Sequence, residues 1–291
     1  MKIGWIGSGV MGSSMACHLQ AAGHDLYVFN RTRSKSLGLL NNGATWCDSP
    51  AEAAAKAEIL FTMVGLPSDV EEVYLGHRGI LTTKGPCRIV IDMTTSRPSL
   101  ARTIAERAAE QGIESLDAPV SGGDIGARNG TLAIMVGGKR ETFEKALPLF
   151  QLMGKNISYM GGPGAGQHTK VCNQILVAGT MIGVCESLLY AAKLGLDQEA
   201  VIDIVGKGAA TSYLFNNLGP RIVRGDYAPG FFVEHFIKDM GIALAEAETA
   251  GLSLPGLGLV HQMYVAVKAQ GHGRSGTQAL FLALKALSGQ T

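Results

Sequence analysis

The stretch KIGWIGSGVMG, residues 2–12, decides the fold of the first half of the chain. Its apolar run, Lys2–Ile6, is long enough for a buried strand, and it leads directly into the glycine-rich turn Gly7-Ser-Gly9-Val10-Met11-Gly12. In a GxGxxG turn the glycines permit a tight bend, close approach of a pyrophosphate and close packing of the next helix on the strand. Residues 13–22 suit that helix, and its free N–H groups would face the phosphates. The stretch therefore predicts a dinucleotide-binding unit.

The rest of the first half alternates strands with helices, which requires parallel pairing and right-handed crossovers. Helices are expected at Ser49–Lys56 and Ser99–Gln111, and from Gly166 onward the pattern is helical. We therefore predict an α/β Rossmann-type domain, residues 1–163, joined by a long helix to an all-α domain, residues 164–291. Strands are expected at Lys2–Ile6, Asp25–Phe29, Ile59–Val64, Arg88–Met93, Glu114–Ala118 and Thr131–Val136.

The composition of the chain indicates which binding partners and which cellular location to expect. The formal net charge is +1 and no run of Lys or Arg occurs, so we expect no nucleic-acid partner and no anionic membrane surface. The uncharged stretch 249–267 is interrupted by Pro255 and several glycines, which disfavours a membrane span. Five scattered cysteines form no metal-ligand pattern, so we predict no metal site and buried, reduced thiols. The first residues run straight into a strand, so no export signal and a cytoplasmic location are expected.

The loop after the second predicted strand favours a phosphorylated cofactor. The fingerprint expects an acid there to hold the ribose 2′-hydroxyl of NAD, but this position is Asn30, followed by Arg31 and Thr32. Arg31 and the Thr32 hydroxyl can bind a 2′-phosphate by charge-assisted hydrogen bonds, whereas an acid would repel it. We therefore predict NADP(H) as the preferred cofactor, with NAD(H) possible. The alternative is a solvated basic loop without a ligand.

Three further loops follow predicted strands and should lie at the same edge of a parallel sheet, where ligands bind. Leu66 and Pro67 are expected to contact the cofactor, and Thr95 to lie between cofactor and substrate. Ser121-Gly122-Gly123 combines a hydroxyl with two unobstructed backbone amides, which suits a substrate carboxylate. Taken alone, Ser-Gly-Gly is more often a simple turn that ends a strand.

Lys170 begins a long apolar helical stretch. Residues 170, 173 and 174 share one helix face, so Lys170, Asn173 and Gln174 should point the same way. An ammonium within hydrogen-bond reach of a carbonyl oxygen can protonate the alkoxide that hydride transfer creates. The alternative is a solvated lysine whose stem covers apolar surface.

With these motifs in hand, the whole chain resembles the β-hydroxyacid dehydrogenase family. The resemblance rests on Ile6–Ala16, on Asp117–Gly123, on Gly164–Asn173, and on Lys238-Asp239 after Phe231. It implies an oxidoreductase with a Rossmann-type domain, a helical domain that builds a homodimer or homotetramer, and a small carboxylate-bearing substrate. It also implies roles: Lys170 as general acid/base assisted by Asn173, Ser121, Gly122 and Gly123 on the substrate carboxylate with Gln174 and Phe231 in the substrate site, and Lys238 over the cofactor.

One departure bears on the substrate. Several family members carry Asn-Asn where this chain has Asn173-Gln174, and the Asn-Gln pair resembles tartronate semialdehyde reductases. We therefore expect an NADPH-dependent reductase of short semialdehydes or 2-oxo acids, of the glyoxylate, succinic semialdehyde or tartronate semialdehyde type. The alternatives are a 3-hydroxyisobutyrate dehydrogenase, an imine-reducing relative, and a non-catalytic NADP-binding relative. Imine-reducing members lack a lysine at position 170, and a non-catalytic relative would be expected to lose Lys170 or Ser121.

Overall fold

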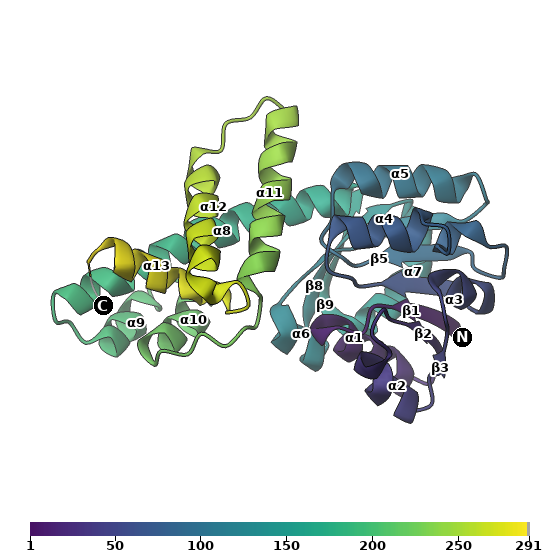
Figure 1. The fold of residues 1–291 in the computed structure, drawn as a ribbon, viewed down its shortest axis with the longest axis horizontal. Coiled ribbons are helices and arrows are strands. Elements are labelled where there is room, and N and C mark those ends of the chain that lie inside the picture. The colour runs from purple at the N-terminus through teal and green to yellow at the C-terminus, as the bar shows by residue number, and fades with distance from the viewer. Residues whose placement is uncertain (290–291) are drawn as a thin grey trace. The chain divides into compact units, whose positions relative to one another are not determined.

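The computed structural model describes residues 1–289 and divides the chain into two compact units (Figure 1). Unit 1 comprises Met1–Lys170 and is a sheet covered by helices, whereas unit 2 begins at Val171 and is helical. The predicted α/β domain followed by an all-helical domain is therefore confirmed. The boundary between the units falls inside one long helix, and the predicted ranges 1–163 and 164–291 stay a prediction.

The sheet of unit 1 is mostly parallel, in the order β3-β2-β1-β4-β5-β6-β8-β7, with β9 paired to β8. Strand β1 lies inside the sheet and pairs in parallel with β2 and with β4. The strands are β1 (Lys2–Ile6), β2 (Asp25–Phe29), β3 (Thr45–Trp46), β4 (Ile59–Thr62), β5 (Ile89–Asp92), β6 (Glu114–Asp117), β7 (Val120–Ser121), β8 (Leu132–Gly138) and β9 (Gly154–Gly161).

Alternate residues of the strands enter two separate cores, because successive side chains of a strand point to opposite faces. Trp5 and Phe61 are fully buried and stack in the core that contains α1 and α7, whereas Leu60 belongs to the core that contains α3, α4 and α5. The helices of unit 1 are α1 (Val10–Ala21), α2 (Leu37–Asn41), α3 (Pro50–Lys56), α4 (Pro67–Leu75), α5 (Pro98–Ala109), α6 (Gly123–Asn129) and α7 (Arg140–Met153), with short 3₁₀ turns at Arg33–Ser36 and Ile80–Thr82.

The predicted strands are confirmed, but their pairing differs at one side of the sheet. Strand β8 lies where Thr131–Val136 was predicted, and it runs antiparallel to β6 and β7. The connection from β6 to β8 contains the short β7 and the seven-residue α6, and β7 itself pairs antiparallel with β8. Strands β3, β7 and β9 were not predicted.

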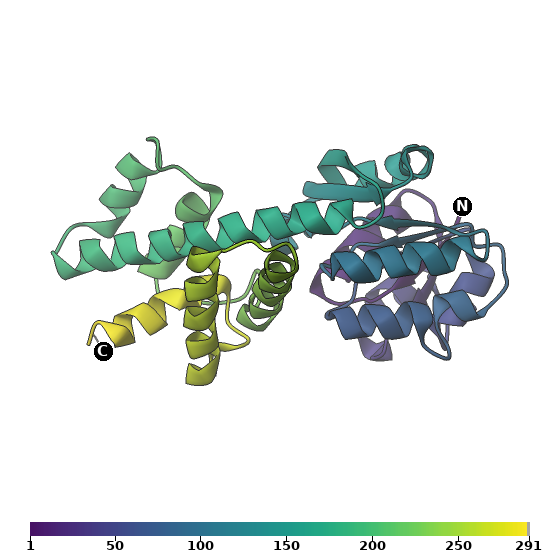
Figure 2. The ribbon, with the colours of Figure 1, turned by 90° about the horizontal axis from the view of Figure 1, so that it is seen from above.

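Unit 2 packs around α8 (Ala165–Lys193), a continuous helix visible in Figures 1 and 2. Among the described residues α8 alone is long and apolar enough to cross a membrane, with a mean hydropathy of 1.8. Its buried positions, such as Ala178, Met181 and Cys185, recur every three or four residues and form the core of unit 2, as in a core helix of a globular protein. The other helices are α9 (Gln198–Val205), α10 (Tyr213–Val223), α11 (Val233–Thr249), α12 (Pro255–Val267) and α13 (Leu280–Leu287), with π and 3₁₀ turns at Lys268–His272 and Thr277–Ala279.

The expectation of five buried thiols is wrong for two of them. All five cysteines are free, but Cys17 and Cys172 are exposed, because each lies on the outer face of its helix. Cys47, Cys87 and Cys185 are buried as predicted, and burial raises the pKa of Cys87 to about 11.

The first turn of α8 is capped by a carboxylate from a distant strand. Gly164 occupies the N-cap position, since its carbonyl accepts from His168 N, and it has no side chain to cap the helix. Asp117, at the end of β6, supplies the missing acceptor: Gly164 N donates to Oδ1 and Gln167 N to Oδ2, both at 2.8 Å. Asp117 is 3% exposed, so burial raises its pKa to about 6, although both N–H groups favour the ionised form.

Glycines allow this close approach between α8 and the sheet. A Cβ on Gly166 would lie 2.4 Å from Met135 O and 2.5 Å from Asp117 O, and a Cβ on Gly137 would lie 2.5 Å from Asp117 Oδ1. Only residues without a side chain therefore let Asp117 reach the helix.

We expect Gly166→Ala to destabilise unit 1 by about 1–3 kcal/mol, because its methyl group would be forced against two backbone carbonyls. The matched control is Gly179→Ala in the same helix, where a Cβ meets nothing within 4 Å. That change should be neutral or stabilise by about 0.5–1 kcal/mol, the difference in helix propensity. Urea unfolding of both variants is the measurement, and equal effects would contradict the close approach.

We expect Asp117 to make the stability of unit 1 depend on pH in an unusual direction. Its folded pKa, about 6, lies above its ordinary value of 3.8, so the folded state binds the proton more tightly. Its contribution to the free energy of unfolding should therefore rise as the pH falls from about 6 to about 4, by up to about 3 kcal/mol. Unfolding curves at several pH values, compared with Asp117→Asn, measure this. A difference between the two proteins that does not change with pH would refute it.

Candidate active site

The predicted fingerprint loop joins β1 to α1 in the geometry that a dinucleotide needs. Gly7 has φ +97°, and a Cβ there would lie 2.1 Å from Met63 O. A Cβ on Gly12 would lie 2.0 Å from Gly7 O, so this glycine lets α1 pack on the turn. A Cβ on Gly9 would meet nothing within 4 Å, which leaves open space beside the helix start at Val10. The residues present therefore fit a bound pyrophosphate.

Two side chains hold this loop in place. The indole Nε1 of Trp5 donates to Gly7 O at 2.8 Å, and Ser8 N donates to the Asn30 side-chain oxygen at 3.0 Å. The Asn30 amide also donates to Thr32 O at 2.8 Å. Asn30 therefore connects the fingerprint loop to the loop after β2, a role that an acid could not fill completely because it has no N–H group.

The loop after β2 also reaches the start of α4. Arg31 is largely exposed, and its Nη1 lies 3.2 Å from Asp69 Oδ1. The other carboxylate oxygen of Asp69 accepts from Leu66 N at 3.1 Å, which caps α4, the helix that begins at Pro67. The structure therefore brings Arg31 and the Leu66-Pro67 turn together. Arg33 lies over the Trp46 ring, 5.2 Å from its centroid.

The loop after β5 is tied to α8, the helix that carries Lys170. Gln167 Nε2 donates to Thr94 O at 2.7 Å, and Ser96 N donates to Gln167 Oε1 at 2.9 Å. Thr95 lies between these two bonded residues and is half-buried. Lys170 follows Gln167 by three residues on α8 and is 7% exposed, so the interpretation of Lys170 as a solvated surface lysine is wrong.

The predicted carboxylate cradle lies at the turn from β7 into α6. Ser121 pairs with Ala133 of β8, and Gly122 and Gly123 have φ values of +132° and +62°. These positive φ values explain why the turn consists of glycines. Ser121 is thus held in the sheet by its pairing with β8 and is half-buried.

The remaining predicted residues belong to unit 2, and three of them, Asn173, Gln174 and Lys238, are connected through Asp239. Asn173 Nδ2 donates to Gln174 Oε1 at 2.6 Å, and the buried Gln174 donates through Nε2 to Asp239 Oδ2. Lys238 Nζ lies 2.8 Å from the other oxygen of Asp239. Phe231 packs on Phe236 with ring centroids 5.6 Å apart.

Sequence reasoning missed the roles of Gln167, Asp69, Asp239 and Asp117 as partners of predicted residues or of the helices that carry them. Two signals were present. Asp69 stands three residues after Leu66, the spacing of a helix cap, and Asp117 is an acid within the predicted strand Glu114–Ala118. For Gln167 no local signal exists, since both of its partners lie more than 70 residues away.

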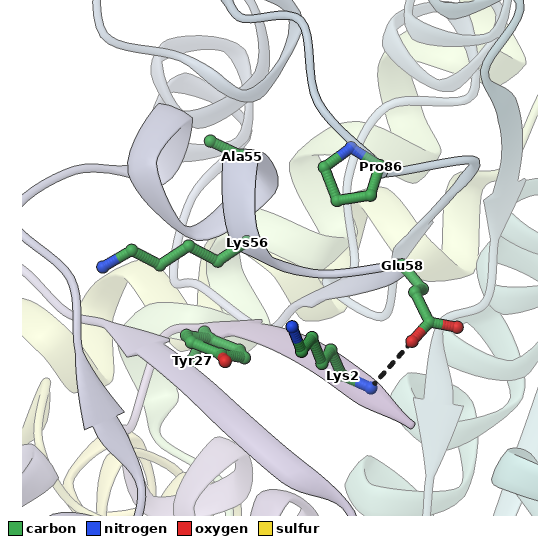
Figure 3. Close-up of a pocket in the computed structure, with 6 residues that line it drawn as sticks. All are labelled: Lys2, Tyr27, Ala55, Lys56, Glu58 and Pro86. Atoms are coloured by element: carbon green, nitrogen blue, oxygen red, sulfur yellow. Dashed lines mark hydrogen bonds between the residues drawn. The ribbon is translucent and has the colours of Figure 1, made fainter.

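A separate hollow of about 520 Å³ lies at the opposite edge of the sheet, near the amino ends of the strands (Figure 3). Lys2 begins β1, and its backbone N donates to Glu58 Oε1 at 3.2 Å. The Lys56 ammonium points away from this pair and lies 2.7 Å from Glu52 Oε1. None of the predicted site residues lines this hollow. Its lining residues are Lys2, Tyr27, Ala55, Lys56, Glu58 and Pro86.

Comparisons with known proteins identify families that match each of the two units. Residues 2–161 match the NAD-binding domain of 6-phosphogluconate dehydrogenase, and residues 164–284 match the NAD-binding domain of NADP-dependent 3-hydroxyisobutyrate dehydrogenase. An uncharacterised oxidoreductase, YkwC of Bacillus subtilis (strain 168), is 54% identical over 96% of this chain and 97% of its own. The 2-hydroxy-3-oxopropionate reductase of Escherichia coli (strain K12) is 38% identical over 99% of this chain and 98% of its own.

A solved structure shows the same fold. The 3-hydroxyisobutyrate dehydrogenase of Mycobacterium tuberculosis, determined with L-serine, superposes with a TM-score of 0.87 over 98% of this chain and 99% of its own, at 30% identity. The two family matches together span residues 2–161 and 164–284, and the relatives are 38% and 54% identical over nearly the whole chain. These matches are sufficient to assign the family. The chain is an NAD(P)-binding oxidoreductase of the β-hydroxyacid dehydrogenase family.

Proposed function

We propose that this enzyme interconverts short semialdehydes or 2-oxo acids and the corresponding hydroxy acids with NADP(H), and that Lys170 is its general acid/base. The observation that carries the proposal is the burial of Lys170 on a helical turn that is hydrogen-bonded to the loop around Thr95. Buried lysines are rare and costly, and they concentrate at functional sites. The glyoxylate, succinic semialdehyde and tartronate semialdehyde type of reductase is our leading substrate class.

The chemistry requires one proton and one hydride. Bound NADPH would supply the hydride to the carbonyl carbon of the substrate. As the carbonyl oxygen gains charge, the Lys170 ammonium donates a hydrogen bond and then its proton to that oxygen. In the oxidative direction the neutral amine of Lys170 takes the proton from the hydroxyl group. Asn173 follows Lys170 by three residues on α8 and assists in this role.

Ser121, Gly122 and Gly123 would bind the carboxylate of the substrate. A hydroxyl and two backbone amides without neighbouring side-chain bulk can donate to its oxygens, and Gly122 is exposed at this turn. Fixing the carboxylate orients the carbonyl carbon for hydride transfer and lowers the entropic barrier. Phe231 and Gln174 would contribute to the same substrate site, and Lys238 would close over the cofactor.

The NADP(H) preference rests on the loop after β2. Arg31 is exposed and pairs with Asp69, so its guanidinium can exchange this weak surface partner for a 2′-phosphate. Thr32 immediately precedes the following 3₁₀ turn and is exposed. Val10, Met11, Leu66, Pro67 and Thr95 would complete the cofactor site.

A second candidate activity is that of a 3-hydroxyisobutyrate dehydrogenase. It is favoured by the close superposition on the mycobacterial enzyme and by the family match of residues 164–284. The same lysine and cradle would serve, because this substrate is also a hydroxy acid. The two candidates differ in substrate and not in mechanism.

We also propose a homodimer or homotetramer in the cytoplasm. Unit 2 exposes large apolar side chains, among them Leu176, Tyr190 and Ile204, each more than 60% exposed. Apolar surface of this kind is typical of contacts between subunits.

Replacing Lys170 by Met or Ala should lower kcat by about 10²-fold or more, because the alkoxide loses its proton donor. The dissociation constant for NADPH should change little. Lys193→Met, which removes an exposed ammonium from the last turn of the same helix, is the matched control and should retain turnover. Steady-state kinetics and NADPH titration measure both. Full turnover in the Lys170 variant would contradict the role of Lys170 as general acid/base.

Changing Arg31 to Asp should move the preference toward NADH, since it replaces a phosphate partner by an acceptor for the ribose hydroxyl. We expect kcat/KM with NADPH to fall by about 10-fold or more, the scale of a lost charge-assisted bond. Arg107→Asp carries the same charge change on the exposed face of α5 and serves as control. If the wild-type enzyme already favours NADH, the interpretation of Asn30, Arg31 and Thr32 is wrong.

Substrates should require a carboxylate one or two carbons from the reacting carbonyl. We would measure NADPH oxidation with glyoxylate, succinic semialdehyde, tartronate semialdehyde and methylmalonate semialdehyde, each beside its methyl ester or an uncharged analogue. An ester leaves the donors of the Ser121–Gly123 cradle poorly matched, a loss on the order of a few kcal/mol. Equal rates for neutral aldehydes would argue against carboxylate recognition.

A further inference from the structure

Gln167 holds two backbone groups of one loop at once. Its amide donates to Thr94 O at 2.7 Å and accepts from Ser96 N at 2.9 Å, and the residue is 1% exposed. A primary amide with one N–H and one C=O engaged in this way pairs with the loop as a neighbouring strand would. Loss of this side chain would leave two buried backbone groups without partners.

The residue enclosed by these two bonds is Thr95. The same loop is fixed on its other side, because Thr94 N donates to Asp92 Oδ1 and Val64 N donates to Thr94 Oγ1, both at 3.0 Å. Thr95 therefore cannot shift along the edge of the sheet without breaking a hydrogen bond. It is the residue that we place between cofactor and substrate.

The turn that carries Lys170 is fixed by the same glutamine. The backbone N of Gln167 donates to Asp117, so Gln167 is held to β6 through its main chain and to the loop after β5 through its side chain. Lys170 is one helical turn further along α8. Gln167 is therefore the residue whose side chain bonds directly to both neighbours of Thr95 and lies one turn before Lys170, beside the Asp117 cap that also holds this end of α8.

We infer that Gln167 is a positioning residue, which sets the distance between the Lys170 ammonium and the reacting carbonyl by clamping the first turn of α8 to the Thr94–Ser96 loop. The inference rests on the proposed role of Lys170. Gln167 acts through that lysine, and of the proposed cofactor site it holds only the loop of Thr95, whereas the fingerprint loop and the loop after β2 lie outside its side-chain bonds. A shift of about 1 Å in a reacting group can cost about 10²-fold in rate.

The test uses Gln167→Met, which keeps the volume of the side chain and removes both bonds. The matched control is Gln20→Met, because the Gln20 side chain also bonds two backbone groups of unit 1, in this case the carbonyls of Leu39 and Asn42. We expect both variants to lose thermal stability. Only Gln167→Met should lower kcat, by about 10-fold to 10²-fold, with the dissociation constant for NADPH within about 3-fold of the wild type.

A double-mutant cycle with Lys170→Met separates positioning from a general loss of structure. If Gln167 acts through Lys170, Gln167→Met should have little further effect on kcat in the Lys170→Met background. Equal losses in both backgrounds, or equal kcat in the Gln167 and Gln20 variants, would overturn the inference while the role of Lys170 stands. Full turnover in Lys170→Met alone would instead defeat the proposed function.

Should Gln167→Met fail to fold, Gln167→Asn replaces it in the same cycle. Asparagine is one methylene shorter and keeps the polarity of the site, but it cannot span both backbone partners. The expected result is the same loss in kcat with unchanged NADPH binding, and the same outcomes decide it.

Discussion

The buried carboxylate of Asp117 is the interaction on which the arrangement of unit 1 depends. A helix that starts on glycine has no cap of its own, and here the acceptor comes from the end of β6. The helix start is an attractive place for negative charge, which offsets part of the cost of burying a carboxylate. Asp117 therefore connects the sheet directly to the helix that carries Lys170, although the two lie about 50 residues apart in the sequence.

This constraint explains the glycines nearby. Gly137 and Gly166 have no room for a methyl group, because the backbone of β8 and the carboxylate itself occupy the space. In the sequence, Gly166 is recognised only as part of a family motif. The physical reason is the short distance between helix and sheet that the cap requires.

Much of the fold was predictable from local pattern, and the missed elements share a cause. Strands β1 and β2 were predicted to the residue, because each is an apolar run that ends at a turn. β3 and β7 contain only two residues, too few for any periodicity. In β9 most side chains are exposed or half-buried, so its sequence lacks the apolar signal of a buried strand.

The candidate site was predictable where a motif is contiguous and not where it depends on the fold. Gly7, Gly9 and Gly12 stand in one turn, and Lys170 stands on one helix face with Asn173. The partners that fix them, such as Gln167 on Thr94 and Asp69 on Arg31, are brought together only by the topology of the sheet. The exposed Cys17 and Cys172 illustrate the same point, since composition does not tell which helix face is outward.

Both tryptophans of the chain lie in unit 1, one in contact with the fingerprint loop and the other with Arg33 after β2. The indole of Trp5 is fully buried and bonded to Gly7 O, whereas that of Trp46 lies under Arg33 and donates to Asp48. The aromatic residues Phe, Tyr and Trp are represented in unit 2 by phenylalanine and tyrosine, without tryptophan. Intrinsic tryptophan emission therefore reports on the nucleotide-binding half alone, and the helical half could melt without a signal in that channel.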